Sequence, residues 1–109
     1  MDTETAARTL AELGNATRLE IFRLLVRAGP YGLPVGEIQE HLDIPGSTLS
    51  HHVSRLVWAG LVSQERQGRT LICRPRHDQL DRVVGFLQAE CCQGVAVRGD
   101  AGKRRRAAR

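Results

Sequence analysis

The sequence predicts a mainly α-helical fold with one small β-hairpin, in the order four helices, two strands and a fifth helix. Up to Val57, apolar residues recur mostly at helical spacing. After Gly60 the period becomes that of strands, on both sides of a turn at Gly68. A short turn at residues 43–46 separates two helical patterns, which is typical of a helix-turn-helix. The hairpin that follows would be the wing of a winged helix-turn-helix.

The first three helices are delimited by capping signals. The first is expected over residues 3–13, and the second begins near Asn15 and ends at Gly29-Pro30. A loop over residues 31–34 leads into a short third helix over residues 35–42. The third and fourth helices, joined by about four residues, form the predicted helix-turn-helix.

The fourth helix has an unusual polar face. It follows Pro45-Gly46, and Ser47 and Thr48 are its expected N-terminal caps. Leu49, Val53, Leu56 and Val57 share an apolar arc, and the opposite side carries Ser47, Thr48, Ser50, His51, Ser54 and Arg55. Surface helices usually expose Glu and Lys, and this face has neither. Short hydroxyl and imidazole side chains can approach DNA closely, so the helix is predicted to read a DNA groove.

The hairpin and the last helix complete one domain. Residues 61–66 and 70–74 flank the turn 67–69, where Gly68 can adopt a positive φ, and Pro75 ends the hairpin. The last helix is expected from Asp78 to about Gln93-Gly94. Residues 1–94 are thus predicted to form a single domain, and residues 95–109 a basic, disordered tail.

The positive charge is concentrated in two places. The chain carries +4 overall, but residues 98–109 hold six basic residues against Asp100, and residues 1–97 hold ten basic against eleven acidic residues. Residues 46–77 contain five arginines and one glutamate, so positive charge is concentrated on the fourth helix and the hairpin. Two roles are open for the basic tail. It is a solvent-exposed segment without a binding role, or it binds DNA phosphates without sequence preference.

The composition excludes several classes of protein. No apolar run reaches the length of about 20 residues that spans a bilayer, and the start lacks the basic residues of a signal peptide, so a cytoplasmic location without membrane contact is expected. Three cysteines, Cys73, Cys91 and Cys92, form no disulfide framework and suggest free, reactive or metal-binding thiols.

Three motifs in the correct order resemble the ArsR/SmtB family of winged-helix repressors. They are residues 13–25 (LGNATRLEIFRLL), with Ala16 where proline is common, residues 47–53 (STLSHHV), and the entry into the wing at Leu56, residues 59–62 (AGLV) and residues 66–69 (RQGR). The resemblance covers about residues 5–93.

The resemblance implies a homodimer on a near-palindromic double-stranded DNA operator. The first and last helices would pack against their symmetry mates through Leu10, Leu13, Leu80, Val84 and Leu87. Bases and nearby phosphates would be contacted by Ser47, Thr48, Ser50, His51 and Ser54, with Arg55 on the backbone and the wing residues Arg66 and Arg69 on phosphate or in the minor groove. His52 is expected to pack or to form a structural hydrogen bond.

Two of the family's metal sites are absent from this chain. The third helix, residues 35–42, has no thiol, and the last helix has Asp78-Gln79-Leu80 with no later histidine. The cysteines that remain as candidate ligands are the adjacent pair Cys91-Cys92, with Cys73 as a candidate third ligand. Some arsenic-responsive members carry such a pair, so the expected inducers are trivalent arsenic, methylated or not, and antimonite. No obligatory cofactor is expected.

The third ligand is left open, because no cysteine follows Cys92. There are three alternatives. The third ligand is Cys73, or it is water or a small thiol. In the third alternative the inducer is a monomethylated arsenic(III) species, which needs only two sulfur ligands. The alternative function is a redox- or sulfide-sensing repressor using the same cysteines. A thiol enzyme is disfavoured because no histidine follows His77 and no phosphate-type loop is visible, and a module used only for protein contacts is a further alternative.

Overall fold

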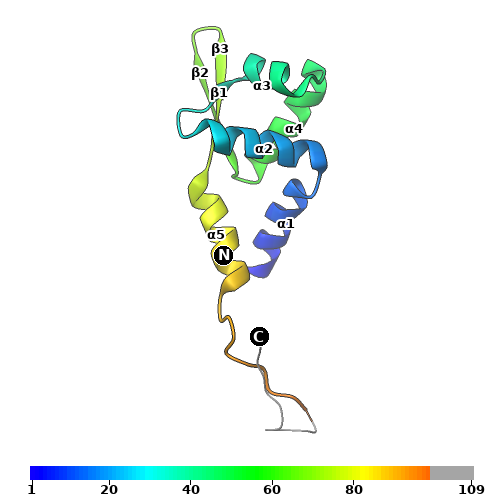
Figure 1. Ribbon diagram of the computed structural model, residues 1–109, viewed down its shortest axis with the longest axis vertical. Helices are drawn as coiled ribbons and strands as arrows, with labels where there is room; N and C mark the ends of the chain where they lie inside the picture. The colour runs from blue at the N-terminus through cyan, green and yellow to red at the C-terminus, as the bar shows by residue number, and fades with distance from the viewer. Residues whose placement is uncertain (99–109) are drawn as a thin grey trace.

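The computed structural model describes residues 1–98 and contains five helices and a three-stranded sheet. The helices are α1 (Thr3–Leu13), α2 (Ala16–Ala28), α3 (Val35–Leu42), α4 (Gly46–Trp58) and α5 (His77–Gln88), and the strands are β1 (Leu33–Pro34), β2 (Val62–Gln67) and β3 (Thr70–Pro75). In Figure 1, α2, α3, α4 and the β2–β3 hairpin form one end of the molecule, and α1 and α5 lie side by side at the other. The predicted winged helix-turn-helix is confirmed. No helix within residues 1–98 is long and apolar enough to cross a membrane.

The first two helices begin and end where local capping dictates. The Asp2 side chain accepts a hydrogen bond from the Thr5 N–H at 2.8 Å, and the Asn15 side chain accepts one from the Arg18 N–H at 3.0 Å. Gly29, with φ 99°, ends α2, and its N–H donates to the Leu25 carbonyl. The bounds of both helices were therefore predictable from the sequence.

The start of α4 differs from the prediction. Pro45, in an extended conformation with ψ 147°, is the N-terminal cap, and no side chain caps the helix. Ser47 and Thr48 lie inside the first turn and are exposed. The reason is that Pro45 holds the extended backbone that precedes a helix, so the chain turns helical at Gly46. The first N–H groups of α4 consequently have no side-chain cap among residues 1–98.

One buried cluster fixes the position of α4. Ile21 and Leu25 of α2, Leu49 and Leu56 of α4, and Ile38 of α3 are fully buried. Leu61, Val62 and Cys73 extend this core under the sheet. Because a side chain of this kind contributes about 1.5–3 kcal/mol when buried, the rotation of α4 about its axis is strongly specified.

The sheet contains one strand that the sequence did not predict. β1 pairs antiparallel with β3, with Leu33 opposite Cys73 and Pro34 opposite Ile72, and gives the order β1-β3-β2. Residues 31–34 were expected to be a loop. Two residues carry no alternating pattern, and Pro34 has no N–H to donate to the sheet, so only the distant partner β3 reveals the strand.

The last helix is shorter than expected. It ends at Gln88, not near Gly94, because Ala89 takes ψ 138° and Glu90 and Cys92 adopt positive φ values of 61° and 66°. Val83 is the only side chain of α5 that is fully buried, so little packing supports a further turn. Cys91 and Cys92 therefore follow the helix and are not part of its last turn.

Gly32 is the glycine whose replacement should cost most. It has φ 74°, and a Cβ atom there would overlap the Cys73 carbonyl oxygen of β3. Gly32→Ala should lower the free energy of unfolding by about 3 kcal/mol, because positive φ and overpacking act together. Gly68→Ala is the matched control, with φ 64° but no atom within 4 Å of the added Cβ. It should cost about 1–2 kcal/mol in urea denaturation, and equal losses for the two variants would contradict the account.

Candidate nucleic-acid interface and thiol pair

The polar face of α4 is exposed as the sequence predicts. Ser47, Thr48, Ser50 and His51 are all exposed, whereas Leu49 between them is fully buried. Ser54 is exposed too, but its hydroxyl donates to the carbonyl oxygen of His51 at 3.0 Å. The face therefore offers hydroxyl and imidazole groups without any acidic side chain.

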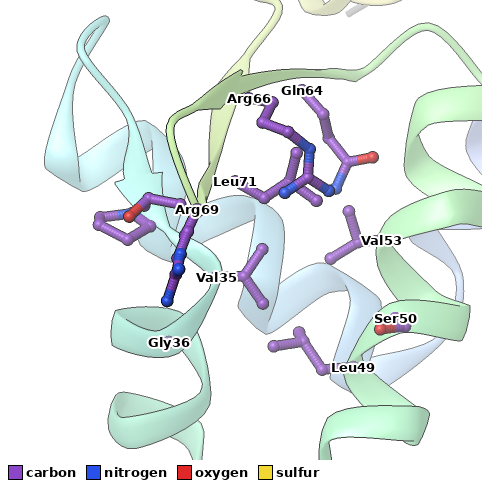
Figure 2. A pocket seen from close by; sticks show the side chains of 11 residues that line it. Val35, Gly36, Leu49, Ser50, Val53, Gln64, Arg66, Arg69 and Leu71 are labelled. Carbon is purple, nitrogen blue, oxygen red and sulfur yellow. The ribbon is translucent and has the colours of Figure 1, made fainter.

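A hollow of about 550 Å³ lies between the start of α3, the hairpin and the side of α4 that carries Leu49, Ser50 and Val53. Figure 2 shows its apolar floor, formed by Val35, Leu49, Val53 and Leu71. Arg66 and Gln64 extend over the floor from the hairpin, and Arg69 extends toward Gly36 at the start of α3. Neither arginine forms an ion pair with another residue of the described chain, so both guanidinium groups are available to phosphate.

Arg55 occupies a different position from the other predicted contact residues. Its Nε and Nη2 donate to the two carboxylate oxygens of Glu12 on α1, at 3.1 and 2.5 Å. The guanidinium also lies 5.3 Å from the ring centroid of Trp58. The expected contact of Arg55 with the DNA backbone stays a prediction, but this side chain is held by α1.

Glu12 is the functional candidate that sequence reasoning missed. Its side chain is 6% exposed, and the hydrogen bonds from Arg55 hold the pKa of the carboxyl below its usual range, against the effect of burial. Nothing in the local sequence marks Glu12, since glutamate on a helix is usually solvated. Its two arginine partners are 6 and 43 residues away in the chain.

Arg18 of α2 lies between Glu12 and a second residue of α4, His52. Its Nε donates to the Glu12 carbonyl at 2.8 Å and lies 3.5 Å from the Glu12 carboxylate, and its Nη1 is 3.2 Å from Nδ1 of His52. Burial, followed by the charge of Arg18, lowers the pKa of His52. A neutral His52 can accept through Nδ1, so the structural hydrogen bond predicted for His52 is confirmed.

The thiols of Cys91 and Cys92 face one another outside α5. Their Sγ atoms are 2.9 Å apart and both residues are exposed. The hydrogen bond with the Cys91 thiol raises the pKa of Cys92. The turn is closed by the Cys91 N–H, which donates to the Gln88 carbonyl at 3.1 Å, and by the Gln93 N–H, which donates to the Glu90 carbonyl at 3.3 Å. The arrangement presents two sulfurs to one soft ion.

Cys73 is not brought to this pair. It is fully buried in β3, where the Gln64 amide lies 3.7 Å from its sulfur, and burial raises its pKa. Within residues 1–98, no three His, Cys, Asp or Glu side chains are grouped so that they could hold a metal ion. The geometry of one chain therefore does not support Cys73 as a third ligand beside Cys91 and Cys92, because it is a core residue of the sheet.

The residues predicted to face a second copy divide into two groups. Leu10, Val84 and Leu87 are 37%, 44% and 60% exposed, as an unpartnered face requires. Leu13 and Leu80 instead pack against the core, and they line a groove of about 370 Å³ with Leu19, Phe22 and Val26. Leu13 and Leu80 are half-buried and have partners in the core of their own chain, so the exposed part of the expected dimer face consists of Leu10, Val84 and Leu87.

Most of the predicted basic tail lies outside the described residues. This part holds five of its cationic residues, Lys103 to Arg106 and Arg109, whereas residues 95–98, with Arg98, have no regular secondary structure.

Known proteins share this arrangement. A family described as a helix-turn-helix domain matches residues 13–65. The putative arsenical resistance operon repressor ArsR of Halobacterium salinarum is 39% identical over 66 residues, which cover 61% of this chain and 50% of that protein. The match thus spans half the length of that relative.

Two further similarities extend over more of the fold. The nodulation protein NolR of Rhizobium meliloti is 31% identical over 86 residues, covering 79% of this chain and 68% of NolR. A solution structure of the homodimeric winged helix-turn-helix domain of Mb0332 from Mycobacterium bovis, described as a possible ArsR-family transcriptional regulator, is 26% identical with a TM-score of 0.64. It covers 77% of this chain, which in turn covers 76% of that domain.

The Glu12 carboxylate should make stability depend on pH. The pKa of Glu12 is lower in the folded protein than in the unfolded chain. The carboxylate therefore makes its full contribution to the free energy of unfolding above about pH 4, the ordinary glutamate range. That contribution is lost as the pH falls through the pKa of the folded state. At pH 7, Glu12→Gln should cost about 1–2 kcal/mol, because Arg55 is half exposed and screened. In urea denaturation at fixed protein concentration this cost should shrink toward pH 3. Glu4→Gln, an exposed change on the same helix, is the control, and a cost independent of pH would contradict the assignment.

Proposed function

Because the chain belongs to the ArsR family of winged helix-turn-helix transcriptional repressors, we propose that it binds a near-palindromic operator as a homodimer and releases it when trivalent arsenic binds Cys91 and Cys92. The protein is therefore a transcriptional regulator and not a thiol enzyme. The observation that carries the arsenic part is the pair of exposed thiols, 2.9 Å apart.

The DNA-reading role rests on the chemistry of α4. Ser47, Thr48, Ser50 and His51 present donors and acceptors that can reach base edges in the major groove. The first N–H groups of α4 have no side-chain cap, and no acidic residue lies in the first turn, which favours a phosphate at that end. Arg66 and Arg69 flank the hollow beside this face and supply the backbone contacts.

Dimerisation is proposed through α1 and α5. Leu10 on α1 and Val84 and Leu87 on α5 expose an apolar face that would be costly in water. The Mycobacterium bovis domain of similar fold is homodimeric. A two-fold axis at this face would place two copies of α4 on successive half-sites of the operator.

Arsenic as the inducer fits the thiol pair better than zinc does. Zinc sites in proteins usually have four ligands, and within residues 1–98 no such group exists. Two adjacent thiolates suit a thiophilic ion with few ligands. The similarity to a putative arsenical resistance operon repressor supports the same inducer class.

The separation of Cys73 from the pair refines the choice of arsenical. With two sulfurs from one chain, monomethylated arsenic(III) would be fully bound, whereas arsenite or antimonite would need water or a small thiol as a third ligand. We therefore expect methylarsenite to be the stronger inducer. The redox alternative would use the same exposed pair, and Cys73 is too buried to take part without opening the sheet.

Serine substitutions test the thiol site. Cys91→Ser and Cys92→Ser should keep operator affinity within about twofold, because neither residue lies near α4, but methylarsenite should no longer release the DNA. Cys73→Ser is the matched control and should respond as the parent does. Fluorescence anisotropy of a labelled operator duplex, titrated with arsenite, methylarsenite and peroxide, provides the measurement.

The outcomes of that titration separate the alternatives. We expect methylarsenite to release the DNA from the parent protein and from Cys73→Ser, and not from Cys91→Ser or Cys92→Ser. Release by peroxide with none by arsenicals would establish the redox alternative, and release by methylarsenite from Cys91→Ser and Cys92→Ser would end the assignment of the site.

The wing arginines should act without sequence preference. Arg66→Gln and Arg69→Gln should each weaken binding to operator and to unrelated duplex alike, by about tenfold, and each should reduce the slope of log affinity against log salt by about 1. Arg27→Gln, on the groove-lining side of α2, is the control and should leave both affinities unchanged. A loss confined to the operator would show that these arginines read bases.

A further inference from the structure

A buried carboxylate from α1 lies against the helix that reads DNA. Glu12 is 4% exposed and accepts both hydrogen bonds of the Arg55 fork, with Nε to Oε1 at 3.1 Å and Nη2 to Oε2 at 2.5 Å. Such a two-point contact between a planar guanidinium and a carboxylate fixes direction as well as distance. It therefore constrains how the last turn of α4 is rotated relative to α1.

The other groups around Glu12 make this contact rigid. Arg18 holds the Glu12 backbone carbonyl at 2.8 Å and the His52 ring at 3.2 Å, so α2 connects the same site to a second turn of α4. Trp58, at the end of α4, has Arg55 at 5.3 Å and Arg8 of α1 at 5.7 Å from its ring centroid. Arg55 and His52 of α4 are thus held by hydrogen bonds from α1 and α2, and Trp58 by a cation–π contact with Arg8 of α1.

The contact is costly enough to need an explanation beyond stability. Removing a carboxylate from water carries a penalty that ion pairs only partly offset, and here they are the pair with the half-exposed Arg55 and the longer one, at 3.5 Å, with Arg18. An apolar residue at position 12 would pack against α4 without that penalty. What an apolar residue cannot supply is a defined direction for Arg55.

We propose that Glu12 is a positioning residue for operator recognition: from the α1 helix it holds Arg55 and thereby fixes the rotation at which the polar face of α4 meets the bases. The inference rests on the proposed DNA-reading function of α4 and goes beyond it, because Glu12 lies on a different helix and does not itself face the DNA. It also assigns Arg55 to this contact in place of a direct role on the DNA backbone.

The test compares specific with non-specific binding. Glu12→Gln removes a negative charge and frees Arg55, so affinity for unrelated duplex should stay equal or rise, since that binding is electrostatic. Affinity for the operator, a duplex selected by the parent protein from a random-sequence library, should fall about tenfold. Glu4→Gln removes the same charge from an exposed site on α1 and should leave the ratio of the two affinities unchanged.

Arg55→Lys distinguishes positioning from direct contact. Lysine keeps the charge but cannot form the fork, so a phosphate contact would survive and a positioning contact would not. We expect Arg55→Lys to lose operator affinity as Glu12→Gln does, and the double variant to lose no more than either single one. Losses that add in the double variant would overturn the inference.

A spectroscopic measurement without DNA provides an independent readout. Trp58 is the only tryptophan, and Arg55 lies over its ring. When Glu12→Gln releases Arg55, acrylamide quenching of the Trp58 emission should increase, and Glu4→Gln should leave it unchanged. Unchanged quenching in Glu12→Gln would overturn the inference.

Folding and function can be separated in these experiments. Circular dichroism and sedimentation should show that each variant is folded and has the parent's oligomeric state at the assay temperature. If Glu12→Gln does not fold, Glu12→Asp keeps the charge and displaces it by one methylene, and the same drop in operator affinity is expected. Failure of the parent to bind any duplex would overturn the proposed function together with this inference, whereas equal operator binding by the parent and Glu12→Gln would overturn the inference alone.

Discussion

Burial of Leu49, Val53 and Leu56 is the constraint on which the rest of the structure depends. These three side chains lie against α2 and the sheet and leave only one face of α4 outside. Because these residues recur at helical spacing, their burial determines which of the residues between them point toward the core and which point toward solvent. From Ser47 to Ser54 the exposed residues are small or polar and free of acid, whereas Val57 and Trp58 at the end of the helix are exposed and apolar. The composition of residues 47–54, more than the net charge of the chain, supports the proposal that α4 reads DNA. The apolar core sets the coarse rotation of α4, and Glu12 adds a directional contact at its last turn.

The proposed sensing site and the proposed reading helix lie in different parts of the molecule. The thiol pair follows α5, which packs against α1, and α1 carries Glu12. Gln79 of α5 donates to the Ala59 carbonyl at the end of α4, at 3.2 Å. A ligand at Cys91 and Cys92 would thus act on a helix already joined to α4 by short polar contacts. Coupling of this kind requires two arrangements of the dimer with different affinities for the operator.

Elements with strong local signals were predictable from the sequence, and those that depend on distant partners were not. Asn15 and Gly29 mark the ends of α2 through their own backbone chemistry. By contrast, β1 exists only because Leu33 lies opposite Cys73, forty residues later. The polar face of α4 followed from periodicity, but the Glu12–Arg55 contact joins helices whose packing no local pattern encodes. The end of α5 was placed too late because Gly94 resembles a stop signal, although Val83 is the last buried residue of α5 and beyond it only Phe86 is partly buried.

The central claim, that one ligand at the thiol pair opposes operator binding, is tested most directly by reciprocity. Methylarsenite would be titrated into the free protein and into the protein bound to its operator, and its affinity measured in each. If the two sites are coupled, the operator must weaken methylarsenite binding by the same factor as methylarsenite weakens operator binding. We predict equal factors, each about tenfold or more. Equal methylarsenite affinity in the presence and absence of operator would contradict the account.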